Sequence, residues 1–399
     1  MPPPAARVLK PSPVIPASSC INSSEKGLFA AGPRVDTRGR RCSGMELKGI
    51  VVVEDLHSRL DSVPFFRPGA LEHVANQPIA YHVLDVLEAA GVEEVVVASS
   101  VELAGDVREC LAARGKPDGA RLRYVDRPGP LDLAGGLGLA APLVGEAACI
   151  VHLASGLLDE PLTPLLRRLR DDSPDVVLVM HQAPSADKHL SAATQEMLHL
   201  AELDPKRAPL AMAGVSLFGP HALGQIGRVA LRSGPDVDLS AVGERIGAAG
   251  GSFLVRVADT WCRYAGNPRD LLELNRIALD GLRTDQRGPD NQGNTFEGRV
   301  WIDERATVGG SVIVGPAVIG PGASIQDAYI GPYTSVGARA RIEGAEVERS
   351  IISAGASIMH VGGRLAASVV GRDARIFRDF SLPRALRLRV GDGTEVALC

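Results

Sequence analysis

Two acidic residues and an arginine follow the first apolar run of the chain. Gly49–Val53 predicts a buried strand, and Glu54, Asp55 and Arg59 come directly after it. Carboxylates can hold a divalent cation and a guanidinium can bind phosphate, so these residues could serve chemistry on phosphate groups. The alternative interpretation is a solvated acidic loop that Arg59 anchors.

The segment Gly69–Pro78 follows this loop and leads into a helix-like stretch. From Glu54 to Pro78 the chain resembles sugar-1-phosphate nucleotidyltransferases, most closely the long form of glucose-1-phosphate thymidylyltransferase. Their pattern is a strand, then GGxGTRL, a catalytic lysine further on, and a PVANKP-like segment. The positions that match this pattern are Arg59, Leu60, Val74, Ala75, Asn76 and Pro78. The positions that depart from it are Glu54, Asp55 and His57 for three glycines, and Gly69 for the lysine.

The resemblance implies a metal-assisted reaction on a nucleoside triphosphate, which needs close backbone N–H donors, a cationic side chain and carboxylates. In the L-G-D-N segment that supplies one metal ligand, this chain offers Ser155. In the W-x-D-x-G passage that supplies the other, Cys262–Tyr264 contains no carboxylate and one residue is inserted. Asp55 and Asp159 are the remaining metal-ligand candidates, although a helix-entry role for Asp159 is favoured. We therefore predict a degenerate site with no cofactor, and with Mg²⁺ only if the protein is active.

The positions that the resemblance assigns to base and sugar also differ. Arg127–Ala134 matches Q-x-x-P-L-G-L-A, with Arg127 in place of glutamine and Asp132 in place of glycine. Arg59 and Arg127 are accordingly the candidate nucleotide-binding residues, and Arg59 is the retained candidate for catalysis. The E-K-P and G-E-L-E-I-T-D segments correspond to 201–203 and 234–240, where the matching residues are largely lost. A glycine cluster at 133–138 is predicted to lie inside a helix rather than to form a phosphate loop.

Apolar segments of two kinds alternate between residues 46 and 260. The strand candidates are Ile50–Val53, Glu94–Ala98, Arg121–Val125, Cys149–Leu153, Val176–Met180, Ala211–Phe218 and Phe253–Val257. Helical patterns between them include Ile79–Ala90, Leu131–Val144 and Pro161–Arg170, and a further helix is expected at Asp270–Leu282. This alternation predicts an α/β fold with a largely parallel sheet. The resemblance makes it a nucleotidyltransferase-like, Rossmann-type mixed sheet.

A six-residue rhythm of aliphatic residues replaces this pattern after a polar linker near 284–295. Its members are Ile302, Val308, Ile313, Ile319, Ile325, Ile330, Val336, Ile342, Ile352, Ile358, Val370, Ile376, Val390 and Val396. Such hexapeptide repeats, with glycine at corners, predict a C-terminal left-handed parallel β-helix. We therefore divide the chain into a disordered Pro- and Arg-rich tail at 1–44, an α/β domain at 45–285 and a β-helix domain at 296–399. Met45 is a candidate for the natural start.

Composition restricts the functional classes. A net charge of −4 and 4% aromatic residues give no indication of nucleic-acid binding, and no apolar run is long enough for a membrane span. The six cysteines form no CxxC pair, which favours a reducing cytoplasm over a disulfide framework or a zinc site.

Three functions remain open. The first is a pseudoenzyme in nucleotide-sugar metabolism, a structural or regulatory partner of an active paralogue that could bind a nucleotide or sugar phosphate. The second is an active transferase whose rebuilt site uses Glu54, Asp55, Arg59 and Asp159. The third is a hexapeptide-repeat acyltransferase, for which His360 is the candidate base. For all three we expect a homo- or hetero-oligomer.

Overall fold

The computed structural model describes residues 46–54, 69–116, 119–182, 210–233, 251–282 and 293–380. The predicted tail at 1–44, the candidate residues Asp55, His57 and Arg59, most of the linker and the last predicted hexads lie outside these ranges. The segments 201–203 and 234–240 lie outside them as well. What the sequence predicts for these residues is not tested by the structure, and the three domain boundaries also stay predictions.

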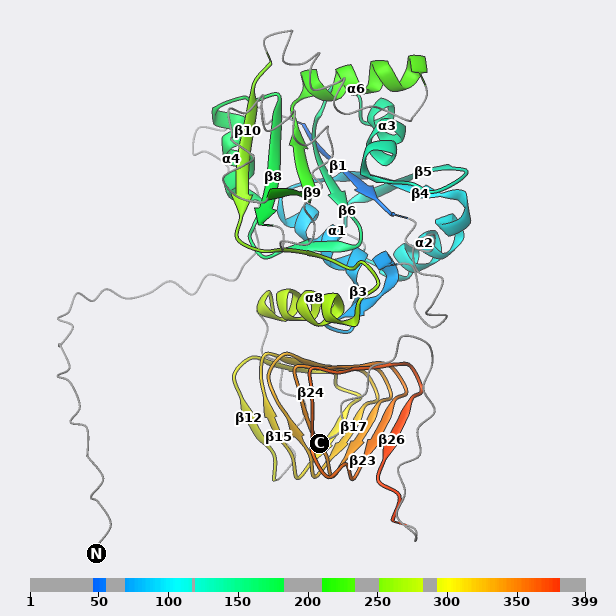
Figure 1. Ribbon diagram of the computed structural model, residues 1–399, viewed down its shortest axis with the longest axis vertical. Helices are drawn as coiled ribbons and strands as arrows, with labels where there is room; N and C mark the ends of the chain where they lie inside the picture. Colours follow the sequence, from blue (N-terminus) through cyan, green and yellow to red (C-terminus); the bar gives the residue numbers. More distant parts are fainter. Residues whose placement is uncertain are drawn as a thin grey trace, which may run out of the picture. The chain divides into compact units, whose positions relative to one another are not determined.

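The first part of the chain forms a seven-stranded mixed sheet in the order β10-β8-β9-β6-β1-β4-β5 (Figure 1). Its strands are β1 (Leu47–Val52), β4 (Glu94–Ser100), β5 (Arg121–Arg127), β6 (Ala148–Leu153), β8 (Val176–Gln182), β9 (Leu210–Phe218) and β10 (Phe253–Ala258). All seven predicted strands are present. Strand β9 is antiparallel to β6 and β8, whereas the other neighbours are parallel.

Helices and short strands surround this sheet. The helices are η2 (Gly69–Leu71), α1 (Ile79–Ala89), α2 (Val101–Ala113), α3 (Leu133–Val144), α4 (Thr163–Asp171), α6 (Pro220–Ser233) and α8 (Pro268–Asp280). The short strands are β2 (His73–Val74) paired with β3 (Gln77–Pro78), and β7 (Gly156–Leu158) paired with β11 (Trp261–Arg263). Among the described residues, no helix is long and apolar enough to cross a membrane.

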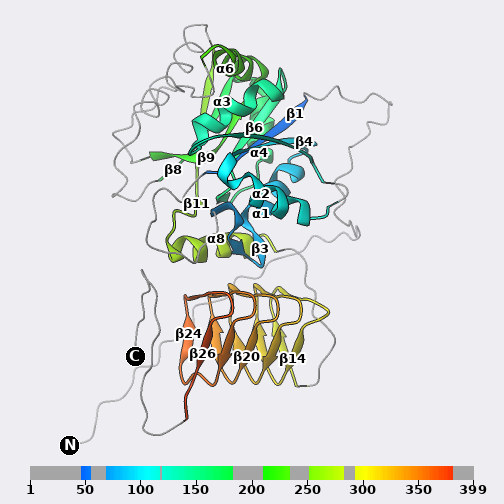
Figure 2. The same cartoon turned by 90° about the vertical axis from the view of Figure 1, so that its right-hand side faces the viewer.

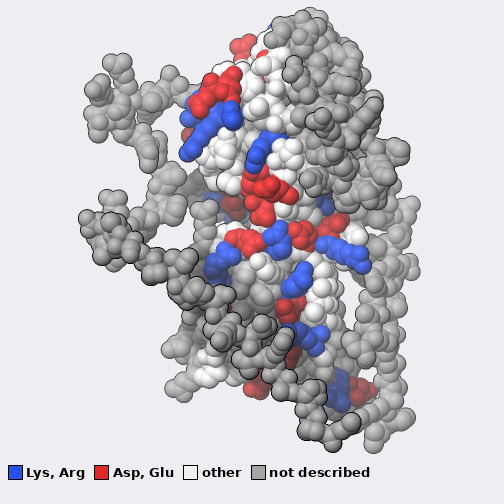
Figure 3. All heavy atoms as spheres, turned by 60° about the vertical axis from the view of Figure 1, so that its left-hand side comes forward, with Lys and Arg blue, Asp and Glu red and all other residues white. Residues whose placement is uncertain are grey.

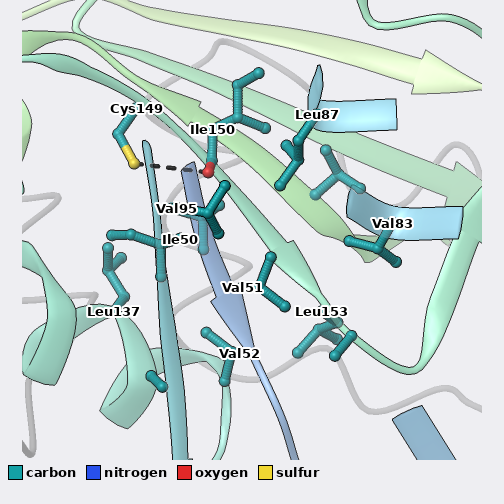
Figure 4. Packing of buried hydrophobic residues seen from close by; sticks show 14 of the residues in the cluster. Ile50, Val51, Val52, Val83, Leu87, Val95, Leu137, Cys149, Ile150 and Leu153 are labelled. Atoms are coloured by element: carbon teal, nitrogen blue, oxygen red, sulfur yellow. Dashed lines mark hydrogen bonds between the residues drawn. The ribbon is translucent and has the colours of Figure 1, made fainter. Parts of the chain in front are cut away.

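The central strand β1 is buried on both faces. Figure 4 shows Ile50 and Val52 on the side of Leu137, which belongs to α3, and Val51 on the side of Val83, which belongs to α1. All five residues are almost wholly inaccessible to water. Cys149 lies in the same core, as its apolar surroundings predict, and burial raises the pKa of its thiol far above the ordinary value. Helices on both faces explain why β1 is apolar and buried from Gly49 to Val52.

The glycine cluster at 133–138 belongs to helix α3, as predicted. A Cβ atom on Gly136 would lie 2.5 Å from Cγ1 and 2.7 Å from Cγ2 of Val52. Glycine at this position therefore lets the helix approach the central strand closely, which is a packing role.

Replacing Gly136 with alanine is expected to destabilise the protein by about 1–3 kcal/mol, because Val52 is buried in the sheet and cannot move aside. Gly105→Ala is the matched control. Gly105 is exposed in helix α2 with nothing within 4 Å of the added Cβ, so that change should stabilise by up to about 1 kcal/mol. Urea denaturation measures both variants. Equal stability of the two would show that α3 and β1 are not in close contact.

The C-terminal part is a three-sided parallel β-helix (Figures 1 and 2). Each side is a five-stranded parallel sheet, in the orders β12-β15-β18-β21-β24, β13-β16-β19-β22-β25 and β14-β17-β20-β23-β26. The strands are β12 (Thr295–Glu297), β13 (Val300–Ile302), β14 (Thr307–Gly309), β15 (Val312–Val314), β16 (Ala317–Ile319), β17 (Ser324–Gln326), β18 (Tyr329–Ile330), β19 (Thr334–Val336), β20 (Arg341–Glu343), β21 (Glu346–Glu348), β22 (Ile351–Ile352), β23 (Ser357–Met359), β24 (Arg364–Ala366), β25 (Val369–Val370) and β26 (Arg375–Phe377). Strand β12 begins at Thr295, one residue before the predicted boundary.

The aliphatic residues of the sequence rhythm form the ladders inside this coil. Ile302, Ile319 and Val336 stand opposite one another in successive turns. Ile325 and Ile342 do so on another side. These residues are almost wholly buried. The architecture is consistent with the predicted left-handed β-helix, in which each turn buries its aliphatic residues against the next.

Candidate functional site

Glu54 follows the central strand β1 at the edge where ligands of α/β sheets bind. Strand β6 runs parallel beside β1, and the Ala154 amide donates to the Val52 carbonyl at 2.8 Å, which brings Ser155 to the same edge. The Ser155 hydroxyl donates to Oε2 of Glu54 at 3.2 Å. Ser155 is only 1% exposed, so this hydrogen bond lies below the protein surface at this edge of the sheet.

Arg263 reaches the same place from a distant part of the chain. Strand β11 pairs with β7, which sets Arg263 opposite Gly156, and the Tyr264 amide donates to the Ser155 carbonyl at 2.9 Å. Nη1 of Arg263 lies 3.2 Å from Oε1 and 3.4 Å from Oε2 of Glu54. We call Glu54, Ser155 and Arg263 the Glu54 cluster.

The Glu54 cluster does not fit a divalent cation. Mg²⁺ prefers several oxygen ligands, and the one carboxylate present is already paired with a guanidinium. At about 4 Å and an effective dielectric of about 20, the guanidinium repels a divalent ion by about 8 kcal/mol, which offsets the attraction of the Glu54 carboxylate at the same distance. The ion pair therefore presents no net negative charge to a divalent cation. Within the described ranges, no group of three His, Cys, Asp or Glu residues could hold a metal ion.

Cys262, next to Arg263, adds no ligand. Burial, together with the nearby carboxylates of Asp270 and Glu273, raises the pKa of its thiol to about 12. The sulfur lies 3.7 Å from the Asp270 carbonyl, to which the thiol donates. At neutral pH this side chain is therefore a protonated thiol, which is a poor nucleophile and a poor metal ligand.

Gly69 stands at the position that the family resemblance assigns to the catalytic lysine. Gly69 opens the short helix η2 and is buried, and its carbonyl accepts from the Glu72 amide at 3.3 Å. It supplies no charge to the sheet edge. Arg59 and Asp55 fall in the undescribed stretch before it, so their roles remain predictions.

Arg127 ends strand β5, at the same edge as Glu54. Strands β1, β4 and β5 are parallel neighbours, which places Arg127 two strands away from the Glu54 cluster. Its Nη2 donates to the Pro130 carbonyl at 3.2 Å. Asp132, at the position of a family glycine, caps helix α3 by accepting from the Gly135 amide at 2.8 Å. Nucleotide binding by Arg127 stays a prediction.

Asp159 lies apart from the Glu54 cluster, beyond the other end of β7. Its carboxylate accepts from Nη2 of Arg276 at 3.0 Å, and Arg276 also contacts Glu273 and Asp280. The helix-entry interpretation is wrong, because helix α4 begins at Thr163 with Leu162 as its N-cap. On the face shown in Figure 3, acidic and basic side chains are intermingled, as such ion pairs require.

Asn275 is a structural residue that sequence reasoning did not single out. It is 1% exposed, and its Oδ1 accepts from the Ala75 amide at 2.8 Å and from the Ser335 hydroxyl at 2.6 Å. Its Nδ2 donates to the Tyr333 carbonyl at 3.0 Å. We call Ala75, Asn275, Tyr333 and Ser335 the Asn275 network. The family-like segment around Ala75 and helix α8 are thus both linked to the β-helix through Asn275.

Known proteins of similar sequence cover nearly the whole chain. A glucose-1-phosphate thymidylyltransferase of Streptomyces griseus is 27% identical over 359 residues, which are 88% of this chain and 99% of that protein. A low-salt glycan biosynthesis nucleotidyltransferase of Haloferax volcanii is also 27% identical, over 88% of this chain and 100% of that protein. Over most of its length the chain is similar to sugar-1-phosphate nucleotidyltransferases.

A further relative has a name with a different base and sugar. Mannose-1-phosphate guanylyltransferase 1 of Arabidopsis thaliana is 26% identical over 68% of this chain and 76% of that protein. A solved structure from Bacillus anthracis that carries the glucose-1-phosphate thymidylyltransferase name has a TM-score of 0.49 and 18% identity, over 58% of this chain and 95% of that chain. No family model matches the chain. The family resemblance seen in the motifs is confirmed.

Proposed function

We propose that this chain is a non-catalytic member of the family, a structural or regulatory partner of a nucleotide-sugar-forming enzyme in the cytoplasm. The observation that carries the proposal is the Glu54 cluster. A guanidinium contacts the carboxylate at the sheet edge, where the family resemblance requires a metal ion and a triphosphate. Gly69, without a side chain, stands at the position of the catalytic lysine.

The residues that remain family-like support a partner role. Ala75 and Asn76 adopt left-handed backbone conformations with φ of 47° and 64°. Nδ2 of Asn76 donates to the Val336 carbonyl at 2.8 Å, and the Ala75 backbone amide donates to Oδ1 of Asn275. These family-like residues hold the β-helix, whereas the positions needed for chemistry have changed. A chain that keeps its scaffold in this way is suited to associate with an intact paralogue or with a second copy of itself.

An active site rebuilt from Glu54, Asp55, Arg59 and Asp159 is less compatible with the described residues. Glu54 pairs with Arg263, and Asp159 pairs with Arg276 beyond the opposite end of β7. For acyl transfer, His360 stands at an exposed corner of the β-helix, 3.5 Å from Glu343, and its ring is tilted by 59° against that of Phe380. Neither arrangement gathers the groups that its reaction needs.

A pyrophosphate-release assay tests the loss of catalysis. With Mg²⁺, dTTP plus glucose 1-phosphate and GTP plus mannose 1-phosphate are expected to give no turnover above blank. Loss of one electrostatic donor costs about 10²–10³-fold in rate, so loss of several should leave the chain at least about 10⁴-fold slower than an active relative. The Streptomyces griseus thymidylyltransferase is the positive control. Clear turnover of any pair would contradict the proposal.

The partner role needs a separate measurement. The purified chain is mixed with an active paralogue from the same host, and the mass of the complex and the paralogue's rate are recorded. We expect a complex by light scattering and a changed rate. If the mixture shows no complex and the paralogue's rate is unchanged, the regulatory role is contradicted. Self-association of the purified chain would then leave a structural role as a homo-oligomer.

A further inference from the structure

We infer that Arg263 replaces a bound metal ion at the sheet edge, so that the site does not take up divalent cations. The inference rests on the proposed function and gives it a specific residue. Counting from Trp261 in the family's W-x-D-x-G passage, the aspartate position is occupied by Arg263. The other metal position is Ser155, and both side chains contact Glu54.

The charge at this edge is inverted with respect to a metal site. Two positions that would supply negative charge now supply a neutral hydroxyl and a fixed positive charge. Among the described residues of this edge, Glu54 supplies the negative charge, and its side chain is only 13% exposed and therefore needs a close cation. Arg263 provides this cation permanently, because a guanidinium does not lose its proton in the physiological range.

The position of Arg263 is fixed by the backbone on both sides. Arg263 stands opposite Gly156 in the β7–β11 pair, and the next residue, Tyr264, donates its amide to Ser155. Glu54 follows β1, whose neighbour β6 leads into Ser155. Main-chain pairing thus fixes the backbone of Arg263 beside Glu54, and the guanidinium contacts both carboxylate oxygens from this position.

Manganese binding to full-length protein tests the inference. The probe is Mn²⁺ alone, followed by electron paramagnetic resonance, for the wild type, Arg263→Asp and Arg263→Asp/Ser155→Asp. We expect no Mn²⁺ site in the wild type and a weak site in Arg263→Asp. The double variant should bind Mn²⁺ at least about tenfold more tightly than Arg263→Asp. Arg256→Asp is the matched control, because Arg256 also lies 3.2 Å from a glutamate, Glu160, but on β10. It should gain no comparable site.

Three outcomes would overturn the inference. They are a wild-type Mn²⁺ site that Glu54→Gln abolishes, an equal gain in Arg256→Asp, and no gain in a folded Arg263→Asp. Because Ser155 is buried, the single variant decides if the double variant fails to fold, as judged by circular dichroism. Turnover by a wild type that binds no Mn²⁺ would contradict the proposed function while leaving the role of Arg263 intact.

Discussion

Asn275→Ala is expected to lower the free energy of unfolding by about 3–5 kcal/mol, because it leaves three buried hydrogen-bonding groups without partners at about 1–3 kcal/mol each. These groups are the Ala75 amide, the Ser335 hydroxyl and the Tyr333 carbonyl. Ser335 is itself wholly buried, so water cannot replace the lost amide without rearrangement. Urea unfolding followed by tryptophan fluorescence measures the change.

Asn267→Ala is the matched control for this prediction. Asn267 is the N-cap of the same helix, α8, and its side chain accepts from the Arg269 amide at 2.9 Å in an exposed setting. Its loss should cost about 1 kcal/mol. The two tryptophans separate the effects, since Trp261 lies in the α/β core and Trp301 in the β-helix. Equal losses in both variants would show that the Asn275 network does not hold the β-helix.

Local patterns predicted the elements of the fold well. The six-residue rhythm placed Ile319 and Ile325 within β-helix strands, because each turn of the coil needs one inward aliphatic residue per side. Apolar runs likewise located strands such as β6 and β4, whose residues are buried throughout. Buried positions are occupied by apolar residues, and the spacing of apolar residues can be read directly from a sequence.

The contacts between distant segments at the site could not be predicted from residue type in this way. Arg263 and Glu54 are 209 positions apart and meet only because β11 pairs with β7 beside the end of β1. The sequence showed that a carboxylate was missing after Trp261, but not that the arginine there would reach Glu54. Asn275 lies in a segment that was predicted as a helix, and its partners come from two other segments of the chain. Periodicity identifies which face is buried and does not identify the contact.

Acidification from about pH 7.5 to about pH 5 is expected to lower the free energy of unfolding by about 2 kcal/mol through His152 alone. Burial lowers the pKa of this imidazole from 6.5 to about 4 in the folded protein. The unfolded chain therefore takes up a proton below about pH 6.5 that the folded chain refuses until about pH 4. Stability falls as the pH drops through this window, and the full loss is reached near its lower end.

His152→Phe isolates this contribution, because the ring still packs beside Trp261, whose centroid lies 5.7 Å from that of the imidazole. The variant should lose the part of the pH dependence that His152 supplies. Any contribution from His82, whose pKa burial also lowers, stays in both proteins. Urea unfolding at a series of pH values compares the slopes, and identical slopes would mean that His152 is solvated.

A neutral His152, with its Nδ1 donating to the Leu153 carbonyl at 2.7 Å, belongs to the core beneath the Glu54 cluster. It is then no acid or base for a reaction at the sheet edge, which is consistent with the proposed loss of catalysis.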